Sequence, residues 1–286
     1  VYQTFFVNLP PLQIRQLDQV VANVFERLES ELSALLENEK PNILGGSVYK
    51  GTTAAALYGF RLAKKRLPGI QTVMGGAVFA DQLALGSPNL DTFLEKTKDC
   101  IDKIIVGEGQ RLFLKLLQGQ LPESQRLFTL KDIDSSVMPV ADSVITDLSD
   151  FRLDYYPYLA TCASRGCPFN CSFCSETVRW GKYRKKDAAK TAAEMIHLSD
   201  TYDSQLFLLT DSLMNPMISD LSRELCNAGV SLYWDGYLRA DKQVCDTENT
   251  ILWRKGGFYR ARLGIESGSQ RILDLMEKKI SPQQIK

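Results

Sequence analysis

The chain has 286 residues, and its 34 Lys and Arg balance its 34 Asp and Glu, so the formal net charge at pH 7 is zero. This balance gives no electrostatic reason to expect nucleic acid or an anionic membrane as a partner. No apolar stretch approaches membrane-spanning length, and the spacing of the seven Cys does not suggest a disulfide framework, so we expect a cytoplasmic protein.

The first 119 residues predict alternating helices and strands. Apolar residues recur at three- and four-residue steps between residues 12 and 36, which indicates a long amphipathic helix. The elements expected after it are strands at 43–49, 70–74 and 101–106 and helices at 53–66 and 110–117. Because strands that alternate with helices form parallel sheets, this part predicts a doubly wound α/β domain.

Small and polar residues follow each of these strands, at the edge where parallel sheets bind ligands. The residues concerned are Ser47, Thr52, Gly75, Gly76, Gly107 and Glu108. A single glycine at such a position is common in ordinary βα turns and does not by itself indicate a binding site. Residues 120–158, which lose periodicity and contain several prolines, predict a linker.

Residues 159–286 predict four strand–helix units. The strands are expected at 159–164, 206–210, 230–238 and 259–265, with helices at 187–198, 216–228, 247–255 and from 270. Parallel repeats of this kind close towards a barrel and gather their loops at the carboxyl ends of the strands. The polar residues at those ends are Asp211, Ser212, Arg239, Glu266 and Ser267, although such residues are also common helix caps.

Cys167, Cys171 and Cys174 form a C-x3-C-x2-C triplet after the first of these strands. Gly166 and Pro168 bend the backbone there, so that the loop can wrap around a bound group. Closely spaced thiolates of this kind bind iron–sulfur clusters, and three of them leave one iron without a protein ligand.

The triplet has three other interpretations. The cysteines are small enough to be simple core residues. A structural zinc site needs four nitrogen or sulfur ligands, yet the single histidine, His197, lies in a helical pattern. Cys162 is a candidate fourth ligand, which would make the site an ordinary electron-transfer cluster, but it falls within a predicted strand.

The triplet, with the aromatic Phe173 before its last Cys, resembles the motif of the radical SAM superfamily. The resemblance implies that the three Cys hold a 4Fe-4S cluster, whose open iron binds S-adenosylmethionine and whose electron cleaves it to a 5′-deoxyadenosyl radical. The SAM contacts that it implies are Phe173, Asp211, Ser212, Arg239, Glu266 and Ser267. Such domains form a partial barrel of six βα units, (β/α)6, whereas this sequence predicts about four. We therefore expect a truncated fragment that is poorly stable or inactive alone.

The strand ends of the first part resemble the Rossmann-like (flavodoxin-type) cobalamin-binding domain that precedes many radical SAM domains. By this likeness Ser47 and Thr52 line the groove for the nucleotide tail, residues 75–76 let the tail pass, and Gly107 and Glu108 lie near the corrin edge. The Asp-x-His-x-x-Gly element whose His binds cobalt in many such domains is missing from the sequence, and the first βα unit is short or missing.

The resemblance therefore implies a cobalamin-dependent radical SAM enzyme, similar to class B methyltransferases. Its reaction would be methyl transfer or rearrangement at an unactivated carbon of a small-molecule or peptide substrate, with flavodoxin or ferredoxin as electron donor. A radical SAM enzyme without cobalamin, such as a sulfur-inserting one, is the first alternative. A four-Cys electron-transfer protein is the second. The sequence identifies neither a catalytic residue nor the substrate.

Overall fold

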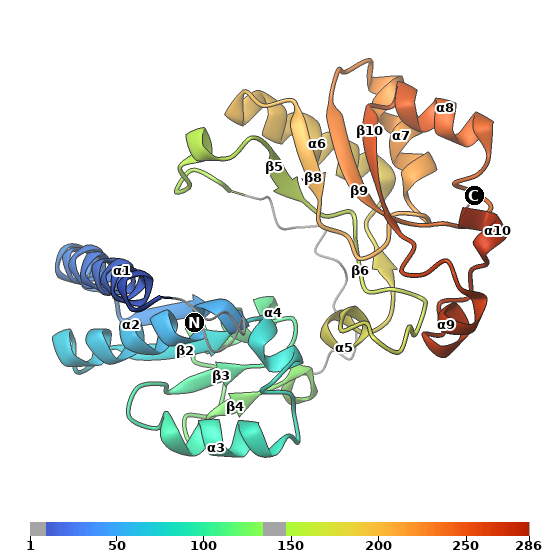
Figure 1. Cartoon of the computed structure of the whole chain (residues 1–286). Helices are drawn as coiled ribbons and strands as arrows, with labels where there is room; N and C mark the ends of the chain where they lie inside the picture. The colour runs from blue at the N-terminus through green and yellow to red at the C-terminus, as the bar shows by residue number, and fades with distance from the viewer. Residues whose placement is uncertain (1–9, 134–146, 286) are drawn as a thin grey trace. The chain divides into compact units, whose positions relative to one another are not determined.

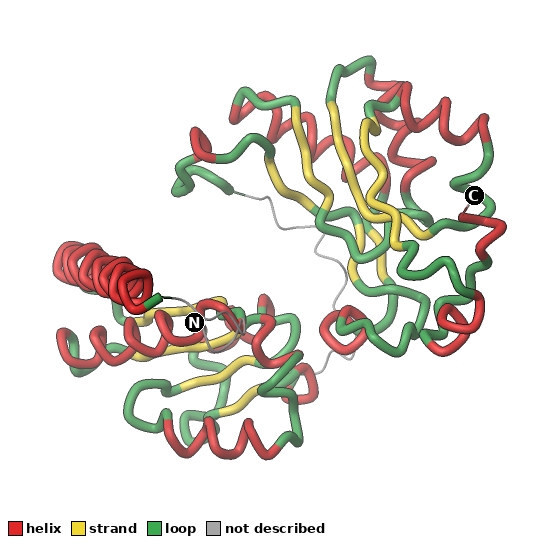
Figure 2. The backbone as a smooth tube through the Cα atoms, in the orientation of Figure 1, coloured by secondary structure: helices red, strands yellow, loops and turns green. Residues whose placement is uncertain are grey.

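The computed structural model describes residues 10–133 and 147–285, which fold into two compact units (Figures 1 and 2). The first unit is Val1–Ser136 and the second is Val137–Lys286. Each contains a four-stranded parallel sheet with helices. The sequence predicts both sheets as parallel, but only three of the four strands of the first one. Among the helices in the described ranges, none has both the length and the apolar character needed to cross a membrane.

The sheet of the first unit has the strand order β1-β2-β3-β4, and all its pairs are parallel. Its strands are β1 (Ile43–Ser47), β2 (Gln71–Gly75), β3 (Lys103–Ile105) and β4 (Leu127–Phe128). Because the strands are parallel, their carboxyl ends lie at one edge, where Ser47 pairs with Gly75.

Four helices accompany this sheet: α1 (Pro11–Glu39), α2 (Thr53–Arg66), α3 (Pro88–Lys96) and α4 (Gln110–Leu117). Alternate residues of a strand point to opposite faces. Met74 and Ile104 accordingly pack in the core formed with α2 and α3, whereas Val73 and Ile105 pack in the core formed with α4. The sheet is therefore covered on both faces.

Helix α1 packs on α2 mainly through its carboxyl-terminal part. Leu36 is fully buried against Ala63, and Leu32 lies over Gly59, where an added Cβ would come within 3.2 Å of the leucine. The sequence predicts one apolar stripe along the whole helix. Only its second half is covered, because Val21 and Val24 remain exposed.

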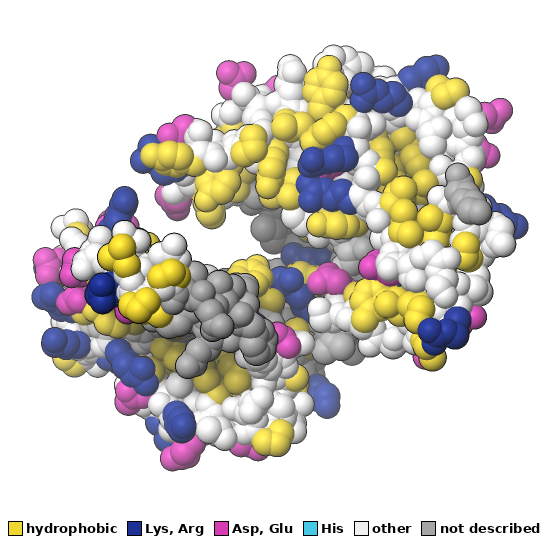
Figure 3. Space-filling view, viewed as in Figure 1, with side chains coloured by type: hydrophobic (Ala, Val, Ile, Leu, Met, Phe, Trp, Pro, Cys, Tyr) yellow, Lys and Arg dark blue, Asp and Glu magenta, His cyan; other side chains and the backbone are white. Residues whose placement is uncertain are grey.

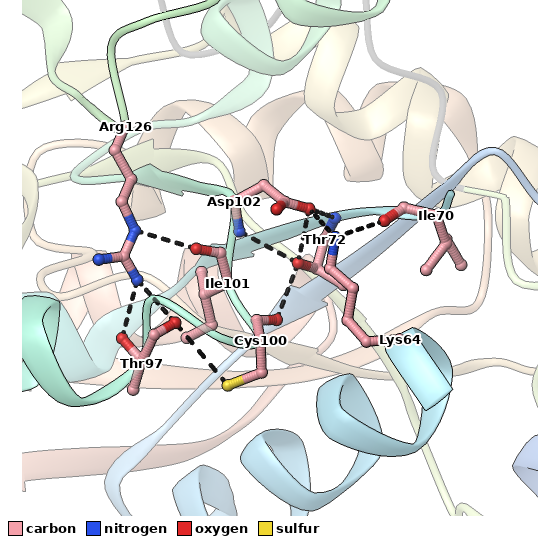
Figure 4. Close-up of polar contacts among 8 residues, drawn as sticks. All are labelled: Lys64, Ile70, Thr72, Thr97, Cys100, Ile101, Asp102 and Arg126. Atoms are coloured by element: carbon pink, nitrogen blue, oxygen red, sulfur yellow. Dashed lines mark hydrogen bonds and ion pairs between the residues drawn. The ribbon is translucent and has the colours of Figure 1, made fainter. Parts of the chain in front are cut away.

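A polar network joins the amino ends of β2 and β3 (Figure 4). Asp102 Oδ2 accepts hydrogen bonds from Lys64 Nζ at 2.6 Å and from the backbone N–H of Thr72 at 2.7 Å. Burial disfavours ionisation of Asp102, but these hydrogen bonds prevail and lower the pKa of its carboxyl group. Arg126 donates to the carbonyl oxygens of Ile101 and Thr97, so this network ties β4 to its neighbours.

Short parts of the predicted linker, residues 120–158, belong to the two folded units. Residues 127–128 form β4, and Phe128 is fully buried in the first unit. Leu148 and Leu153 pack against the core of the second unit. A two-residue strand has no periodicity to detect, which is why sequence patterns miss it. Residues 134–146 of the predicted linker lie outside the described residues.

The sheet of the second unit has the order β10-β9-β8-β5, again entirely parallel. Its strands are β5 (Leu159–Thr161), β8 (Leu206–Leu209), β9 (Tyr233–Arg239) and β10 (Phe258–Gly264). The helices α6 (Ala188–Tyr202), α7 (Ile218–Ala228) and α8 (Thr247–Lys255) contribute Met195, Leu221 and Trp253 to the core. Phe207 and Trp234 meet them from the sheet.

A small antiparallel hairpin follows β5 and interrupts the strand predicted at 159–164. It pairs β6 (Ser164–Arg165) with β7 (Arg184–Lys185), and the short helix α5 (Glu176–Trp180) lies between them. Two further helices, α9 (Gln270–Leu275) and α10 (Pro282–Ile285), end the described chain. The hairpin therefore carries the cysteine triplet at the carboxyl edge of the parallel sheet.

Candidate functional site

The triplet lies in the Cys loop, which we define as residues 166–175, directly after β6. Gly166 adopts a left-handed backbone with a φ of 78°, a conformation that favours glycine. A Cβ at this position would lie 2.7 Å from the carbonyl oxygens of Gly181 and Lys182. Glycine therefore lets the two arms of the hairpin approach each other at the base of the Cys loop.

The three cysteines of the triplet are free thiols and partly buried. The backbone N–H of Cys174 donates to the carbonyl oxygen of Cys171 at 3.1 Å, which closes the loop into a turn. Burial raises the pKa of the Cys167 thiol, and the neighbouring charges of Cys171 and Cys174 raise it further. The backbone N–H of Phe169 and the Arg239 guanidinium act in the opposite direction. Cys167 thus lies within electrostatic range of both other cysteines of the triplet.

The triplet does not form a site for a single metal ion. Within residues 10–133 and 147–285, no three His, Cys, Asp or Glu side chains are grouped closely enough to bind one ion. A mononuclear zinc site needs such a group.

Cys162 lies in a different environment. Burial raises the pKa of its thiol, and the charges that act on it come from Asp211, Lys186 and Arg165. Cys162 lies between β5 and β6, outside the Cys loop that carries the triplet. That Cys162 is separate from the triplet stays a prediction.

The Cys loop is docked on the segment that follows α9. The Ser172 backbone N–H donates to the carbonyl oxygen of Met276 at 3.0 Å. The ammonium of Lys278 lies 5.5 Å from the centroid of the Phe173 ring and 3.0 Å from Glu266 Oε1. Sequence reasoning missed Lys278, because only the fold brings it to the loop.

Asp211 follows β8 and ties the start of the hairpin to the sheet. It is 1% exposed, and its carboxylate accepts hydrogen bonds from the backbone N–H of Ala163 at 3.0 Å and from the Ser164 hydroxyl. Burial raises the pKa of Asp211 to about 6, although both hydrogen bonds lower it. Ser212 donates to Glu176 Oε2 at 2.6 Å, which anchors α5. Asp211 and Ser212, two of the six predicted SAM contacts, therefore stabilise the hairpin in this structure.

Arg239 ends β9 with its side chain directed at the Cys loop. The guanidinium carbon lies 3.8 Å from the centroid of the Phe169 ring, and the residue is only 6% exposed. Asn215 holds the Arg239 backbone, accepting from its N–H at 2.8 Å and donating to its carbonyl oxygen at 3.0 Å. The Nη2 atom of Arg239 is buried and has no hydrogen-bond partner among the described residues. Asn215 was not predicted, because only the fold brings its side chain to the end of β9.

Glu266 and Ser267 lie at the carboxyl end of β10. Glu266 adopts a left-handed backbone with a φ of 64°, which is uncommon for a residue other than glycine. The Ser267 hydroxyl accepts from the backbone N–H of Ser269 at 3.1 Å, a local turn contact of the kind that the sequence left open. Glu266 reaches Phe173 through Lys278, so this strand end also contacts the Cys loop.

The residues predicted for cobalamin gather at the carboxyl edge of the first sheet. Ser47, Thr52 and Gly107 are exposed there, whereas Glu108 is buried. The Thr52 hydroxyl is engaged in a local turn, because it accepts from the backbone N–H of Tyr49.

The glycine pair of this edge has a packing role in the first unit. A Cβ at Gly76, whose φ is 106°, would lie 2.4 Å from the backbone nitrogen of Val48. A Cβ at Gly75 would lie 3.3 Å from the carbonyl oxygen of Ile105. Gly76 therefore permits close approach of the protein's own backbone.

A cavity of about 500 Å³ lies at the opposite edge of the first sheet. Its cations are already paired: Lys103 Nζ donates to the carbonyl oxygens of Glu123 and Gln125 at 2.6 and 2.7 Å, and Lys64 binds Asp102. These contacts stabilise the strand ends and leave the carboxyl edge as the better candidate for ligand binding.

No protein-family model matches the chain. An uncharacterized methyltransferase from Pyrococcus horikoshii is 24% identical over 280 residues, which cover 89% of this chain and 58% of the relative. The anaerobic magnesium-protoporphyrin IX monomethyl ester cyclase of Rubrivivax gelatinosus is 26% identical over 90% of this chain and 50% of its own length. The chain thus spans about half the length of these curated relatives.

Solved structures share the fold. The cobalamin-dependent S-adenosylmethionine radical enzyme OxsB, with aqua-cobalamin and S-adenosylmethionine bound, matches 90% of this chain with a TM-score of 0.68 and 17% identity, over 40% of its own chain. The radical S-adenosylmethionine methyltransferase TsrM from Kitasatospora setae, with tryptophan substrate and a SAM analog bound, matches 88% with a TM-score of 0.65 and 17% identity, over 54% of its own chain.

Proposed function

Because this chain is a relative of the cobalamin-dependent radical SAM enzymes, we propose that it carries the cluster-binding and cofactor-binding parts of such an enzyme. The observation that carries the proposal is the Cys loop itself. The Cys167 thiol lies within electrostatic range of both other free thiols of the triplet. The buried Arg239, whose Nη2 has no hydrogen-bond partner in the described part of the chain, stacks on Phe169 of the same loop.

Cys167, Cys171 and Cys174 would hold a 4Fe-4S cluster. Bound there with an open iron, the cluster supplies the electron that cleaves S-adenosylmethionine to a 5′-deoxyadenosyl radical. The chain's own part is positioning. Asp211 braces the start of the hairpin, and the carbonyl oxygen of Met276 fixes Ser172 between two of the cysteines.

Arg239 is the residue best suited to the methionine carboxylate of SAM. Its guanidinium is buried and stacked on Phe169, and its backbone is held by Asn215, so the side chain is already oriented. An arginine fork binds a carboxylate through charge-assisted hydrogen bonds, and Nη2 has its donors available. The remaining predicted contacts, Phe173, Glu266 and Ser267, would surround the rest of the cofactor.

Cobalamin would bind at the carboxyl edge of the first unit, which would be a cobalamin-binding Rossmann-type domain. The exposed Ser47, Thr52 and Gly107 are the most accessible residues for it. The second unit would be the first part of a (β/α)6 barrel, since its strands run in the order β5, β8, β9, β10. Flavodoxin or ferredoxin would donate electrons, and the substrate would be a small molecule or peptide.

Methyl transfer to an unactivated carbon is the reaction that we propose, in line with the relatives named as methyltransferases. Ring formation is the second candidate, since the Rubrivivax gelatinosus relative is named as a cyclase. Product analysis separates them. Methyl transfer yields S-adenosylhomocysteine and a methylated product together with 5′-deoxyadenosine, whereas ring formation yields 5′-deoxyadenosine without either of the first two.

The decisive test is anaerobic reconstitution with iron and sulfide, followed by EPR of the reduced protein with and without SAM. We expect a 4Fe-4S signal that changes when SAM is added, because an open iron accepts the cofactor. A cluster signal that is indifferent to SAM would contradict the proposal and favour a four-Cys electron-transfer site.

A further inference from the structure

The face of the second sheet that lies away from its helices carries two arginines on β10. Trp234 and Leu238 of β9 point into the core, so Asp235 and Tyr237 point to the other face. The register pairs Arg260 with Asp235 and Arg262 with Tyr237. An irregularity between Phe258 and Arg260 shifts the alternation of β10, so that both arginines share the face of Asp235 although Phe258 is in the core.

The two arginines converge on one carboxylate oxygen. Asp235 Oδ2 accepts from Arg260 Nε at 2.7 Å and from Arg262 Nη2 at 2.8 Å. Asp235 is 1% exposed, and its Oδ1 is buried without a hydrogen-bond partner in the described part of the chain. Two guanidinium groups and one carboxylate leave the cluster with one net positive charge.

The cluster is accessible from the face of the sheet. The Arg260 and Arg262 side chains are 51% and 28% exposed, in contrast to the buried Asp235 beneath them. Figure 3 shows dark blue Lys and Arg side chains over β9 and β10, bordered by yellow hydrophobic ones. Within the described residues, Arg260 forms its hydrogen bonds only with Asp235, so other donors of its guanidinium remain for a ligand.

Aromatic rings flank the arginines. The Arg262 guanidinium lies 5.4 Å from the centroid of the Tyr237 ring, and its Nη1 lies 3.4 Å from the Tyr237 hydroxyl. Tyr237 and Tyr233 are both about half exposed on this face. A ligand at this position would meet a positive charge and a flat apolar surface together.

We propose that Arg260 and Arg262 form a subsite for an anionic group of the substrate, a carboxylate or a phosphate. The inference rests on the proposed function and names the substrate class for it. Paired arginine forks suit planar carboxylates and phosphates, and Asp235 orients the forks while cancelling only one of the two charges.

The subsite lies close to the cofactor edge. Asp235 and Tyr237 precede Arg239 by four and two residues on β9, which is roughly 13 and 7 Å along a strand. A substrate anchored by its anionic end at the arginines therefore has its other end near Arg239 and the Cys loop.

Binding measurements on the full-length protein test the subsite. The probes are phenyl phosphate and benzoate, with the neutral benzyl alcohol as control, measured by isothermal titration calorimetry. We expect at least one anion to bind, more weakly at high salt, and benzyl alcohol not to bind. Preference for phenyl phosphate or for benzoate identifies the anionic group. Equal binding of benzyl alcohol, or binding of neither anion, overturns the inference.

The test variant is the double substitution Arg260→Gln with Arg262→Gln. The control is Arg223→Gln, whose side chain is exposed on helix α7. Removing both arginines leaves Asp235 buried without a partner, which threatens folding. A triple variant that also carries Asp235→Asn removes this unpaired buried charge. Of the double and the triple variant, each one that folds should bind the anion at least tenfold more weakly than the wild type. Arg223→Gln should keep the wild-type affinity. Unchanged affinity in the triple variant overturns the inference.

The effect of SAM on the cluster EPR signal separates this inference from the proposed function. In the triple variant we expect the response to SAM to persist while anion binding is lost. Loss of the SAM response instead would overturn the inference, because it would assign the arginines to the carboxylate of SAM. A wild-type protein that binds the anion but shows no SAM response would contradict the proposed function alone.

Discussion

Arg239 stacks on Phe169, with its guanidinium carbon 3.8 Å from the ring centroid. This contact joins the carboxyl end of β9 to the Cys loop, and it also places a positive charge where it partly offsets the rise that burial causes in the pKa of Cys167. The guanidinium is held by its burial against the Phe169 ring, and Asn215 fixes the backbone by binding both the N–H and the carbonyl oxygen of Arg239. A single side chain thus links the sheet edge, the cysteine triplet and the predicted site of the SAM carboxylate.

Replacing Arg239 with Met should weaken SAM binding by about 10- to 100-fold, the value of a charge-assisted hydrogen bond. The iron content of the reconstituted protein should stay the same, because Arg239 is not a thiolate ligand. Equilibrium dialysis with labelled SAM measures the first quantity and iron analysis the second. Arg223→Met on α7 is the control. If Arg239→Met bound SAM with wild-type affinity, Arg239 would not be a contact of SAM.

The sequence predicts the elements whose signals are local. The bounds of α4 and α8 agree with the prediction, and Asp246 caps α8 as helix chemistry requires. The Cys triplet is likewise a local pattern. Residues that act through distant contacts escape such reasoning. Lys278 meets Phe173 only after α9 folds back, and β4 is a two-residue strand that exists only by pairing with β3.

Gly166→Ala should destabilise the protein far more than Gly181→Ala. Both glycines have left-handed backbones, with φ values of 78° and 68°, so each substitution carries a cost of about 1–2 kcal/mol. A Cβ at Gly181 meets nothing within 4 Å, whereas one at Gly166 lies 2.7 Å from two carbonyl oxygens. We expect an additional loss of about 2 kcal/mol for Gly166→Ala. Urea unfolding of both variants measures it, and equal losses would show that the hairpin arms can separate.

Asp211 should make stability fall as pH rises through the mildly acidic range. An Asp in an unfolded chain titrates near 3.9, about two pH units below the folded value. Burial raises the pKa of Asp211 to about 6, so the folded state binds its proton more tightly than the unfolded state. The free energy of unfolding should therefore decrease between pH of about 4 and 6.5 and level off above it, with a total loss on the order of 2–3 kcal/mol.

The variant Asp211→Asn isolates this contribution, because it keeps the shape of the side chain and removes the titration. We expect the difference in unfolding free energy between wild type and variant to change across that pH range. Asp220→Asn, exposed on α7, is the control and should show no such change. Parallel curves for wild type and Asp211→Asn would mean that Asp211 does not hold its proton more tightly in the folded state.

Lys278→Met should lower the reduction potential of the cluster. The Lys278 ammonium is largely buried beside Phe173, and a nearby positive charge stabilises the reduced, more negative cluster. We expect a decrease of about 30–60 mV, a three- to tenfold change in the one-electron equilibrium. EPR-monitored redox titration measures it, with Lys255→Met on α8 as control. An unchanged reduction potential would mean that the charge of Lys278 acts only in its ion pair with Glu266.

Cysteine substitutions distinguish an open cluster from a closed one. Cys171→Ala should abolish both the cluster and the SAM response, because two thiolates remain from the triplet. Cys162→Ala should leave both intact, since Cys162 lies between β5 and β6, outside the Cys loop. Iron and sulfide analysis with EPR measures the outcome. If Cys162→Ala lost the cluster as well, four thiolates would hold it, no iron would be open, and the chain would carry an electron-transfer site.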